Sequence, residues 1–178
     1  MGTGILVCGL NGCGKSTLGA ALAKELGFHF IDNEQLYFPG TDPRNPYAAP
    51  RTRAEAEQML FCEIDRHENF IFAAVRGDYG ENITDRYHYA VYLEVPRDTR
   101  LQRIRNRSFC KFGSRMLSGG DLYEQEEAFF RMAEKRSEDY VENWLKTLHC
   151  PILYADGTAP TEDTVQKILT HFPLLKQL

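Results

Sequence analysis

The chain has 178 residues, of which 43% are hydrophobic and 26% are charged, and its formal net charge is −4. This is the composition of an ordinary globular protein, and we expect residues 1–178 to form one domain with a full core. The acidic balance argues against a protein that wraps nucleic acid. No apolar run approaches the roughly 20 residues that a membrane-spanning helix needs, so we expect no membrane partner.

The N-terminal region and the cysteines indicate the compartment of the protein. The first residues lack the basic segment of a signal peptide, and residues 4–9 are apolar enough for a core strand. Five widely spaced cysteines contain no C-x-x-C pair, which is typical of free thiols in a reducing compartment. We therefore expect a cytoplasmic protein. The sequence leaves open whether it is a monomer or a homodimer.

Residues 9–17, with the sequence GLNGCGKST, fit the phosphate-binding pattern G-x-x-x-x-G-K-S/T. The glycines of such a loop leave room for a phosphate and let backbone N–H groups form an anion-binding nest. Lys15 adds a positive charge for the β- and γ-phosphates, and the Ser16 hydroxyl can ligate Mg²⁺. ATP and Mg²⁺ are therefore the predicted cofactors. The predicted ATP-binding residues of the loop are Gly9, Asn11, Gly12, Cys13, Gly14, Lys15, Ser16 and Thr17.

The flanking residues place this loop between a strand and a helix. Residues 5–9 form a short apolar run without charge, as expected of a central parallel strand. Apolar residues then recur at helical spacing over residues 15–26, and Gly27 stands where a helix cap belongs. The alternative is a plain glycine-rich turn. It is disfavoured because such a turn does not require an apolar strand before it and a helix after it.

A second strand is predicted over residues 28–32, which are rich in aromatic and β-branched side chains. It ends at Asp32, and Glu34 follows two residues later. Ligands of open α/β sheets bind beyond the carboxyl ends of the strands. Asp32 and Glu34 are therefore candidate substrate-binding residues, and Asp32 is also a candidate Mg²⁺ ligand. The alternative is that these carboxylates cap the next helix.

Residues 38–50 hold four of the eight prolines and predict a long irregular loop, a type of segment that is often functional. A substrate-side helix is predicted over residues 51–68. Arg44, Arg51 and Arg53 stand on the approach to this helix and can grip an anionic substrate through bidentate hydrogen bonds. The alternative is that they are solvated surface arginines.

An uninterrupted apolar run over residues 70–75 predicts a buried third strand. Arg76 follows it as a candidate for binding the substrate, and Asp78 is a carboxylate that can hold Mg²⁺ or its waters. Residues 79–88 are predicted to be a polar connection, and residues 89–95 a fourth strand.

Arginines dominate the helix that is predicted over residues 97–108. We expect Arg97 and Arg100 on a solvated face. Arg103 and Arg107 lie four residues apart, so they share one face of the helix.

The next segment, residues 109–120, contains Gly113, Gly119 and Gly120, which suggest hinges, and the cation Arg115. A basic segment flanked by glycines suits a lid, because it can exclude water and bring positive charge to a transferring phosphoryl group. We therefore predict a lid over residues 109–120.

The remaining residues complete the fold. Residues 121–148 predict a long helix with a bend, and Asp121 is its candidate N-cap. Residues 151–155 predict a fifth strand and residues 161–171 the last helix. Strands that alternate with helices predict an α/β fold: a three-layer α/β/α P-loop NTPase with a five-stranded parallel sheet.

In this order of elements the chain resembles the adenylate kinase, shikimate kinase and gluconate kinase group of small P-loop kinases. The resemblance rests on the phosphate loop, on Asp32 after the second strand, on the arginine-rich helix and lid, and on the Asp-Gly-Thr turn at 156–158. Residues 111–127 also look like those of uncharacterised bacterial AAA-type ATPases or kinases. The substrate signatures differ, because the chain has Asp-Asn-Glu at 32–34 where shikimate kinases carry Asp-x-Asp.

The resemblance implies roles for particular residues. Asp32 would lie near the acceptor hydroxyl, Arg103 and Arg107 would contact ATP, and Gly157 would lie beside the adenine. The predicted catalytic residues are Lys15, Asp32, Arg107 and Arg115.

The sequence thus favours an ATP-dependent phosphotransferase that acts on a small acceptor, either a hydroxyl-bearing metabolite or a nucleoside monophosphate. Lys15 and the lid arginines would neutralise developing charge, and Asp32 would orient or deprotonate a hydroxyl. The phosphate of a nucleoside monophosphate would instead be held by Arg44, Arg51, Arg53 or Arg76.

The alternative from another class is a nucleotide-binding switch or slow NTPase whose bound state is recognised by a protein partner. A kinase for nucleic-acid ends is disfavoured by the acidic balance.

Overall fold

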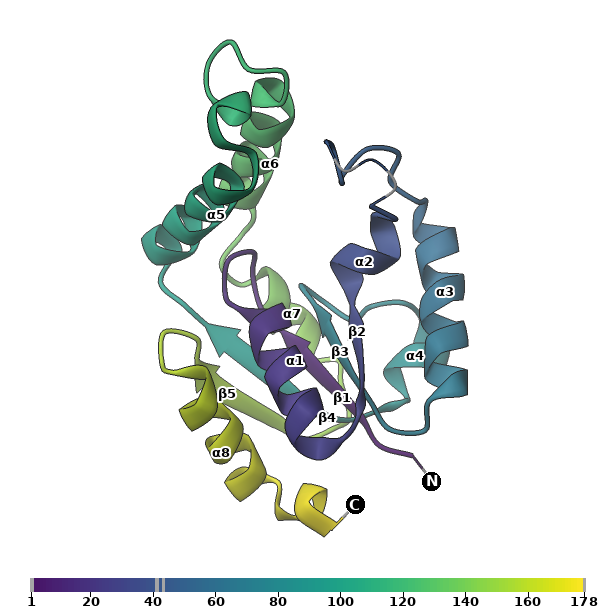
Figure 1. The fold of residues 1–178 in the computed structure, drawn as a ribbon. Coiled ribbons are helices and arrows are strands. Elements are labelled where there is room, and N and C mark those ends of the chain that lie inside the picture. Colours follow the sequence, from purple (N-terminus) through teal and green to yellow (C-terminus); the bar gives the residue numbers. More distant parts are fainter. Residues whose placement is uncertain (1, 41, 43, 178) are drawn as a thin grey trace.

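Figure 1 shows the computed structural model of the chain, in which five parallel strands form one sheet covered by helices. The structure describes residues 2–40, 42 and 44–177. Met1, and Thr41 and Pro43 of the predicted loop, lie outside the described residues. The sheet order is β2-β3-β1-β4-β5. The strands are β1 (Gly4–Cys8), β2 (His29–Asp32), β3 (Phe70–Ala74), β4 (Tyr87–Glu94) and β5 (Ile152–Asp156). The predicted α/β fold with a five-stranded parallel sheet is confirmed.

Helices join the strands and cover the sheet. The α-helices are α1 (Lys15–Leu26), α2 (Asn33–Tyr37), α3 (Arg53–Arg66), α4 (Glu81–Thr84), α5 (Arg97–Phe112), α6 (Tyr123–Lys135), α7 (Tyr140–Leu145) and α8 (Thr161–His171). Two short 3-10 turns, η1 (Gly113–Met116) and η2 (Pro173–Gln177), complete the chain. None of the described helices is both long and apolar enough to cross a membrane.

The middle strand β1 is buried along its whole length, which explains its apolar sequence. Ile5 pairs with Ile71 of β3 on one side and with Tyr89 of β4 on the other. Because all the strands are parallel, their carboxyl ends meet at one edge of the sheet. The loops that follow β1, β2 and β3 therefore gather there, as they do in other open α/β sheets.

Helices α5 and α6 pack on each other and stand above this edge (green in Figure 1). They enclose a small hydrophobic cluster of their own, which includes Ile104, Phe112, Met116 and Phe130. This cluster is separate from the main core of the sheet. The residues of the predicted lid, 109–120, form the end of α5, η1 and the turn into α6.

The prediction of one long helix over 121–148 is wrong. The chain leaves the helix at Arg136, whose backbone is extended (φ −66°, ψ 127°), and α7 begins four residues later. Asp121 is not the N-cap of α6, because that position is Leu122 and has no side-chain cap. The Asp121 carboxylate instead accepts two hydrogen bonds from Arg115, at 2.9 and 2.6 Å.

The prediction that Arg100 is solvated is also wrong, since its exposed fraction is 2%. Its guanidinium donates to both carboxylate oxygens of Glu138, at 2.6 and 2.8 Å, and to the Val95 and Asn11 carbonyls. The spacing of charged residues along a helix does not reveal which of them is buried by a distant segment. Arg100 is covered by residues around Asn11 and Glu138. Arg97 is half-exposed, as expected for the solvated face.

Two short helices lie outside the predicted helix ranges, although capping of the next helix was the stated alternative for Asp32. Helix α2 starts directly after Asp32, whose carboxylate accepts a hydrogen bond from the Glu34 N–H at 2.9 Å and so caps the helix. Helix α4 lies within the predicted polar connection. Strand β4 also begins two residues earlier than expected, at Tyr87.

Candidate active site

The phosphate loop joins β1 to α1 and is shaped by its glycines. Gly12 has φ +86°, and a Cβ there would lie 2.5 Å from the Arg100 carbonyl oxygen. A Cβ on Gly9 would lie 2.7 Å from the Leu93 carbonyl oxygen. Side chains are therefore excluded at both positions by the backbone of β4 and α5, whereas the space around Gly14 is open. The α5 helix thus starts directly against the loop.

Lys15 is the first residue of α1 and lies at the centre of the site. Its Nζ donates to the Leu10 carbonyl at 2.9 Å, which folds the side chain back over the loop. Burial lowers the pKa of Lys15 below its usual value. The neighbouring Cys13 is buried, and burial raises the pKa of its thiol, which favours the neutral form.

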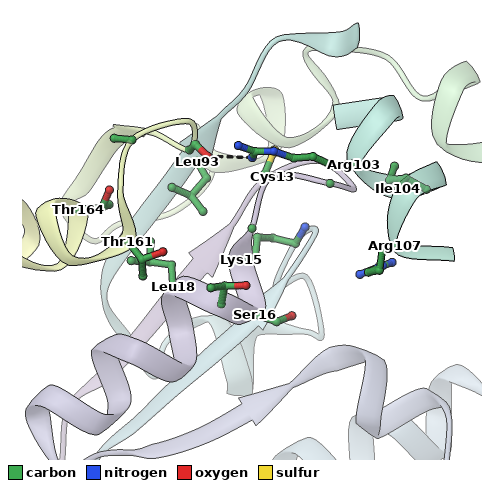
Figure 2. A pocket seen from close by; sticks show the side chains of 15 residues that line it. Cys13, Lys15, Ser16, Leu18, Leu93, Arg103, Ile104, Arg107, Thr161 and Thr164 are labelled. Carbon is green, nitrogen blue, oxygen red and sulfur yellow. Dashed lines mark hydrogen bonds between the residues drawn. The ribbon is translucent and has the colours of Figure 1, made fainter. Parts of the chain in front are cut away.

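A cavity of about 360 Å³ lies over the loop on the α8 side (Figure 2). Residues of α5 bound it on one side, and Thr161 and Thr164 of α8 bound it on the other. Arg103 Nη1 donates to the Gly157 carbonyl at 2.9 Å, which ties α5 to the turn after β5. A Cβ on Gly157 would lie 2.8 Å from the Cys13 carbonyl oxygen, so that turn rests on the phosphate loop.

A second cavity of about 390 Å³ lies on the other side of Lys15, toward β2 and β3. Four residues line both cavities: Gly12, Lys15, Ser16 and Arg107. The second cavity is otherwise lined by polar groups and aromatic rings from distant segments, among them Asn11, Asp32, Glu34, Tyr37, Phe38, Arg76, Asp78, Tyr79, Phe129, Arg136 and Tyr140. The two cavities therefore meet at the lysine and serine of the phosphate loop.

The carboxylates of the second cavity differ in their surroundings. Asp32 caps α2 with one oxygen and is a half-buried residue of the cavity wall, which Ser16 also lines. Glu34 accepts a hydrogen bond from the Tyr47 hydroxyl at 3.0 Å and lies 3.9 Å from Arg107. Asp78 is paired with Arg76 at 2.6 Å.

Two guanidinium groups flank the ring of Tyr140 at the far side of this cavity. Arg76 lies 4.1 Å from the ring centroid and Arg136 lies 5.0 Å from it. Arg136 also donates to the Asn11 side chain at 2.6 Å. The Nε of Arg76 is buried and has no hydrogen-bond partner among the described residues. Two guanidinium groups in one cavity wall suit a bound anion, and Arg76 is at the same time paired with Asp78.

Sequence reasoning missed Arg136 because it was expected inside a continuous helix. Arg136 and Tyr140 stand four residues apart, as side chains on one helix face do, but the helix is interrupted between them. The four-residue spacing of Arg136 and Tyr140 was thus only a weak indication that they lie together. It gave no indication that Arg136 contacts Asn11.

Four predicted arginines do not line either cavity in the described part of the chain: Arg44, Arg51, Arg53 and Arg115. Arg51 donates to the carbonyls of α2, and Arg53 donates to the Asp78 carbonyl at 2.5 Å. Arg115 donates to the Arg44 carbonyl at 2.6 Å and pairs with Asp121. Their roles in binding or catalysis stay predictions.

The predicted lid and the start of α6 contact the proline-rich loop. Lys111 of α5 donates to the Tyr47 hydroxyl at 3.0 Å, and the Gln125 and Asn45 side chains hydrogen-bond to each other. With the Tyr47–Glu34 hydrogen bond, this forms a chain of contacts from α5 to the second cavity.

A side chamber of about 240 Å³ lies beneath these contacts, between Phe38, Tyr47 and Phe129. Glu34 and Arg107 line both the chamber and the second cavity. Glu126 of α6 also lines the chamber and is 2% exposed. Its carboxylate makes no hydrogen bond to any residue that the structure describes, and its oxygens are not fully buried, so the group is open to the chamber.

The residues around Ser16 fit a magnesium ion. Ser16 and Asp32 line one cavity and offer hydroxyl and carboxylate oxygens, the ligands that Mg²⁺ prefers. Asp78 is less suited, because its carboxylate is already paired with Arg76.

Comparison with known proteins agrees with this architecture. Residues 5–128 match the model of a family described as AAA domain. The chain is 30% identical over 175 residues to the uncharacterized protein YqaC of Bacillus subtilis (strain 168), covering 94% of this chain and 96% of YqaC.

Two solved structures show the same fold. A gluconokinase from Sinorhizobium meliloti 1021 has a TM-score of 0.58 and 17% identity, covering 97% of this chain and 93% of that one. A shikimate kinase from Bacteroides thetaiotaomicron has a TM-score of 0.58 and 20% identity, covering 97% and 99%. The chain therefore belongs to the AAA domain family, has YqaC as a relative, and has the fold of the small P-loop kinases.

Proposed function

We propose that the protein is an ATP-dependent phosphotransferase for a small acceptor. One observation carries the proposal: two cavities of similar volume meet at Gly12, Lys15, Ser16 and Arg107. A phosphoryl transferase needs this arrangement, because donor and acceptor must approach in line on either side of the transferred group. A nucleotide switch needs a single nucleotide cavity.

The first cavity is the proposed ATP site. The nest of the phosphate loop would hold the phosphates, and the Arg103–Gly157 contact would border the base. Lys15 would leave the Leu10 carbonyl for the β- and γ-phosphates, and Arg107 would neutralise charge from the other side. Ser16 and Asp32 would hold Mg²⁺, which would supply positive charge to the phosphates.

The second cavity is the proposed acceptor site. Asp32 would orient or deprotonate the acceptor hydroxyl, since it lines the cavity together with Lys15 and Ser16. Arg76 and Arg136 would hold an anionic group of the acceptor, and the aromatic rings would pack on its carbon skeleton. Glu126 would meet a donor group of the acceptor in the side chamber.

We favour a hydroxyl-bearing metabolite with a carboxylate or phosphate group as the acceptor. Of the arginines predicted to hold a nucleoside monophosphate, Arg76 lines the second cavity, whereas Arg44, Arg51 and Arg53 do not. A cytoplasmic location and a monomeric or homodimeric state belong to the same proposal.

The test is an ATP-consumption screen of the purified protein with Mg²⁺. The acceptor panel contains hydroxy acids, sugar acids and sugar phosphates, with the uncharged parent alcohols and nucleoside monophosphates as comparison groups. Stimulation by an anionic hydroxyl compound and not by its uncharged parent supports the proposal. An ATPase rate that no acceptor changes would favour the slow NTPase instead.

A further inference from the structure

His29, Glu63 and His67 form a cluster at the edge of the sheet opposite the phosphate loop. His29 is the first residue of β2, and the other two residues stand at the end of α3, which leads into β3. His29 Nε2 lies 2.8 Å from Glu63 Oε2, and His67 Nε2 lies 3.9 Å from the same oxygen. One ligand atom from each residue lies within 4.8 Å of the others.

The two imidazole rings are stacked, with centroids 3.6 Å apart and planes inclined by 13°. The Nε2 atoms of both rings lie within 4 Å of the same carboxylate oxygen of Glu63. Two ligands of a tetrahedral zinc ion, each about 2.1 Å from it, lie about 3.4 Å apart. The two nitrogen–oxygen distances in the cluster fall on either side of that value. Because an ion lies in the plane of each imidazole that binds it, at least one of the two rings must rotate out of the stack before both can ligate the same ion.

The hydrogen bonds of the cluster leave room for an ion. The His67 ring makes no hydrogen bond to any residue in the described part of the chain, although its Nε2 faces Glu63. Arg66 approaches the other oxygen of Glu63, at 3.5 Å, and leaves Oε2 to the histidines. The three side chains are 32%, 30% and 41% exposed, which gives an ion an entry path and lets water complete its coordination.

We propose that His29, Glu63 and His67 bind a divalent transition-metal ion of the zinc class. Imidazole nitrogen and carboxylate oxygen are ligands that Zn²⁺ accepts together. The ion would connect the edge strand β2 to α3, which packs against α2. The site is structural and does not depend on the proposed kinase activity, since β2 separates it from Asp32 by about 10 Å.

The test uses the full chain after treatment with EDTA, and it measures Zn²⁺ binding by calorimetry and by melting temperature. We expect one Zn²⁺ per chain and a melting temperature that rises by about 5–10 °C at a hundredfold excess over the dissociation constant. His67→Gln and His29→Gln should each weaken binding at least about tenfold. His149→Gln is the matched control, because His149 is an exposed histidine of the chain outside the cluster.

Exposed thiols also bind zinc, so the titration is repeated with Cys62 and Cys110 both replaced by Ser. Unchanged binding in that variant supports the histidine site. The proposal is overturned if the parent protein takes up no Zn²⁺, if His67→Gln binds as tightly as the parent, or if the cysteine variant loses binding. Melting curves without metal check that each variant folds, and none of the readouts involves nucleotide.

Discussion

The two cavities that meet at Lys15 are built in different ways. On the proposed nucleotide side, one continuous segment, residues 12–18, supplies seven of the fifteen lining residues, and β4, α5, the turn at Gly157 and α8 supply the others. The acceptor side is assembled from the phosphate loop, the segments after β2 and β3, and helices α5 and α6. A local motif can therefore identify the first cavity, whereas the second exists only after the chain has folded.

The segment after α6 shows how the two cavities are linked. Arg136 donates to the Asn11 side chain, and Arg100 donates to the Asn11 carbonyl and to Glu138. Hydrogen bonds thus connect the phosphate loop both to α5 and to the segment that follows α6. Movement of these two helices would alter both cavities together, as lid closure in a kinase requires.

The largest effect is expected from Lys15→Ala, which tests the group that the two cavities share. Loss of the charge at the transferring phosphoryl group should reduce kcat by about 10³-fold or more. The measurement is ATP turnover with the acceptor found by the screen. Lys24→Ala, an exposed lysine of the same helix, is the control and should keep full activity. Full turnover by Lys15→Ala would contradict the account.

Asp32→Asn tests the acceptor side of the reaction. The amide still caps α2 but cannot take up a proton, so kcat should fall by about 10²- to 10⁴-fold. ATP affinity measured without Mg²⁺ should stay unchanged. The matched control is Asp163→Asn, an exposed residue in the first turn of α8. Wild-type turnover in Asp32→Asn would remove this residue from the mechanism.

Arg100→Ala tests the attachment of α5 to the phosphate loop. The change removes a buried side chain and leaves the Val95 carbonyl without its donor, which should lower the free energy of unfolding by about 2–4 kcal/mol. Arg97→Ala, at a half-exposed position of the same helix, should cost less than about 1 kcal/mol. Chemical denaturation of both variants measures the difference. Equal stability would mean that Arg100 is dispensable.

Arg136→Gln separates acceptor binding from nucleotide binding. Loss of a charged hydrogen bond to the acceptor should raise its KM by about 10- to 100-fold. The KM for ATP should change much less. Arg131→Gln, an exposed arginine of α6, serves as the control. An Arg136 variant with an unchanged acceptor KM would show that the anion binds elsewhere.

Glu126→Gln should change stability and activity in opposite directions. Because this carboxylate lines the side chamber and makes no hydrogen bond in the described part of the chain, removing its charge should stabilise the fold slightly, by less than about 1 kcal/mol. The acceptor KM should rise several-fold, since the proposed donor group loses a charged partner. Thermal melting and steady-state kinetics measure the two effects, with Glu124→Gln as the exposed control. A stabilised variant with an unchanged KM would mean that the chamber does not contact the acceptor.

The sequence predicted those parts of the molecule that depend on neighbouring residues. The strands, α1 and its Gly27 cap, and the phosphate loop each follow from a local pattern, and the structure contains them. The break at Arg136 and the burial of Arg100 were not predictable, because both depend on contacts with Asn11, far away in the sequence. For the same reason the sequence suggested four arginines for binding the substrate, at 44, 51, 53 and 76, of which Arg76 lines the second cavity.

The central claim is that a phosphoryl group passes from the first cavity to an acceptor in the second. Phosphorus-31 NMR of the protein with Mg-ATP and the stimulating acceptor tests this most directly, because it shows where the phosphoryl group goes. The account predicts a new phosphate-ester signal that grows in step with ADP and is absent with Lys15→Ala. Growth of inorganic phosphate alone, at one rate with and without acceptor, would contradict it.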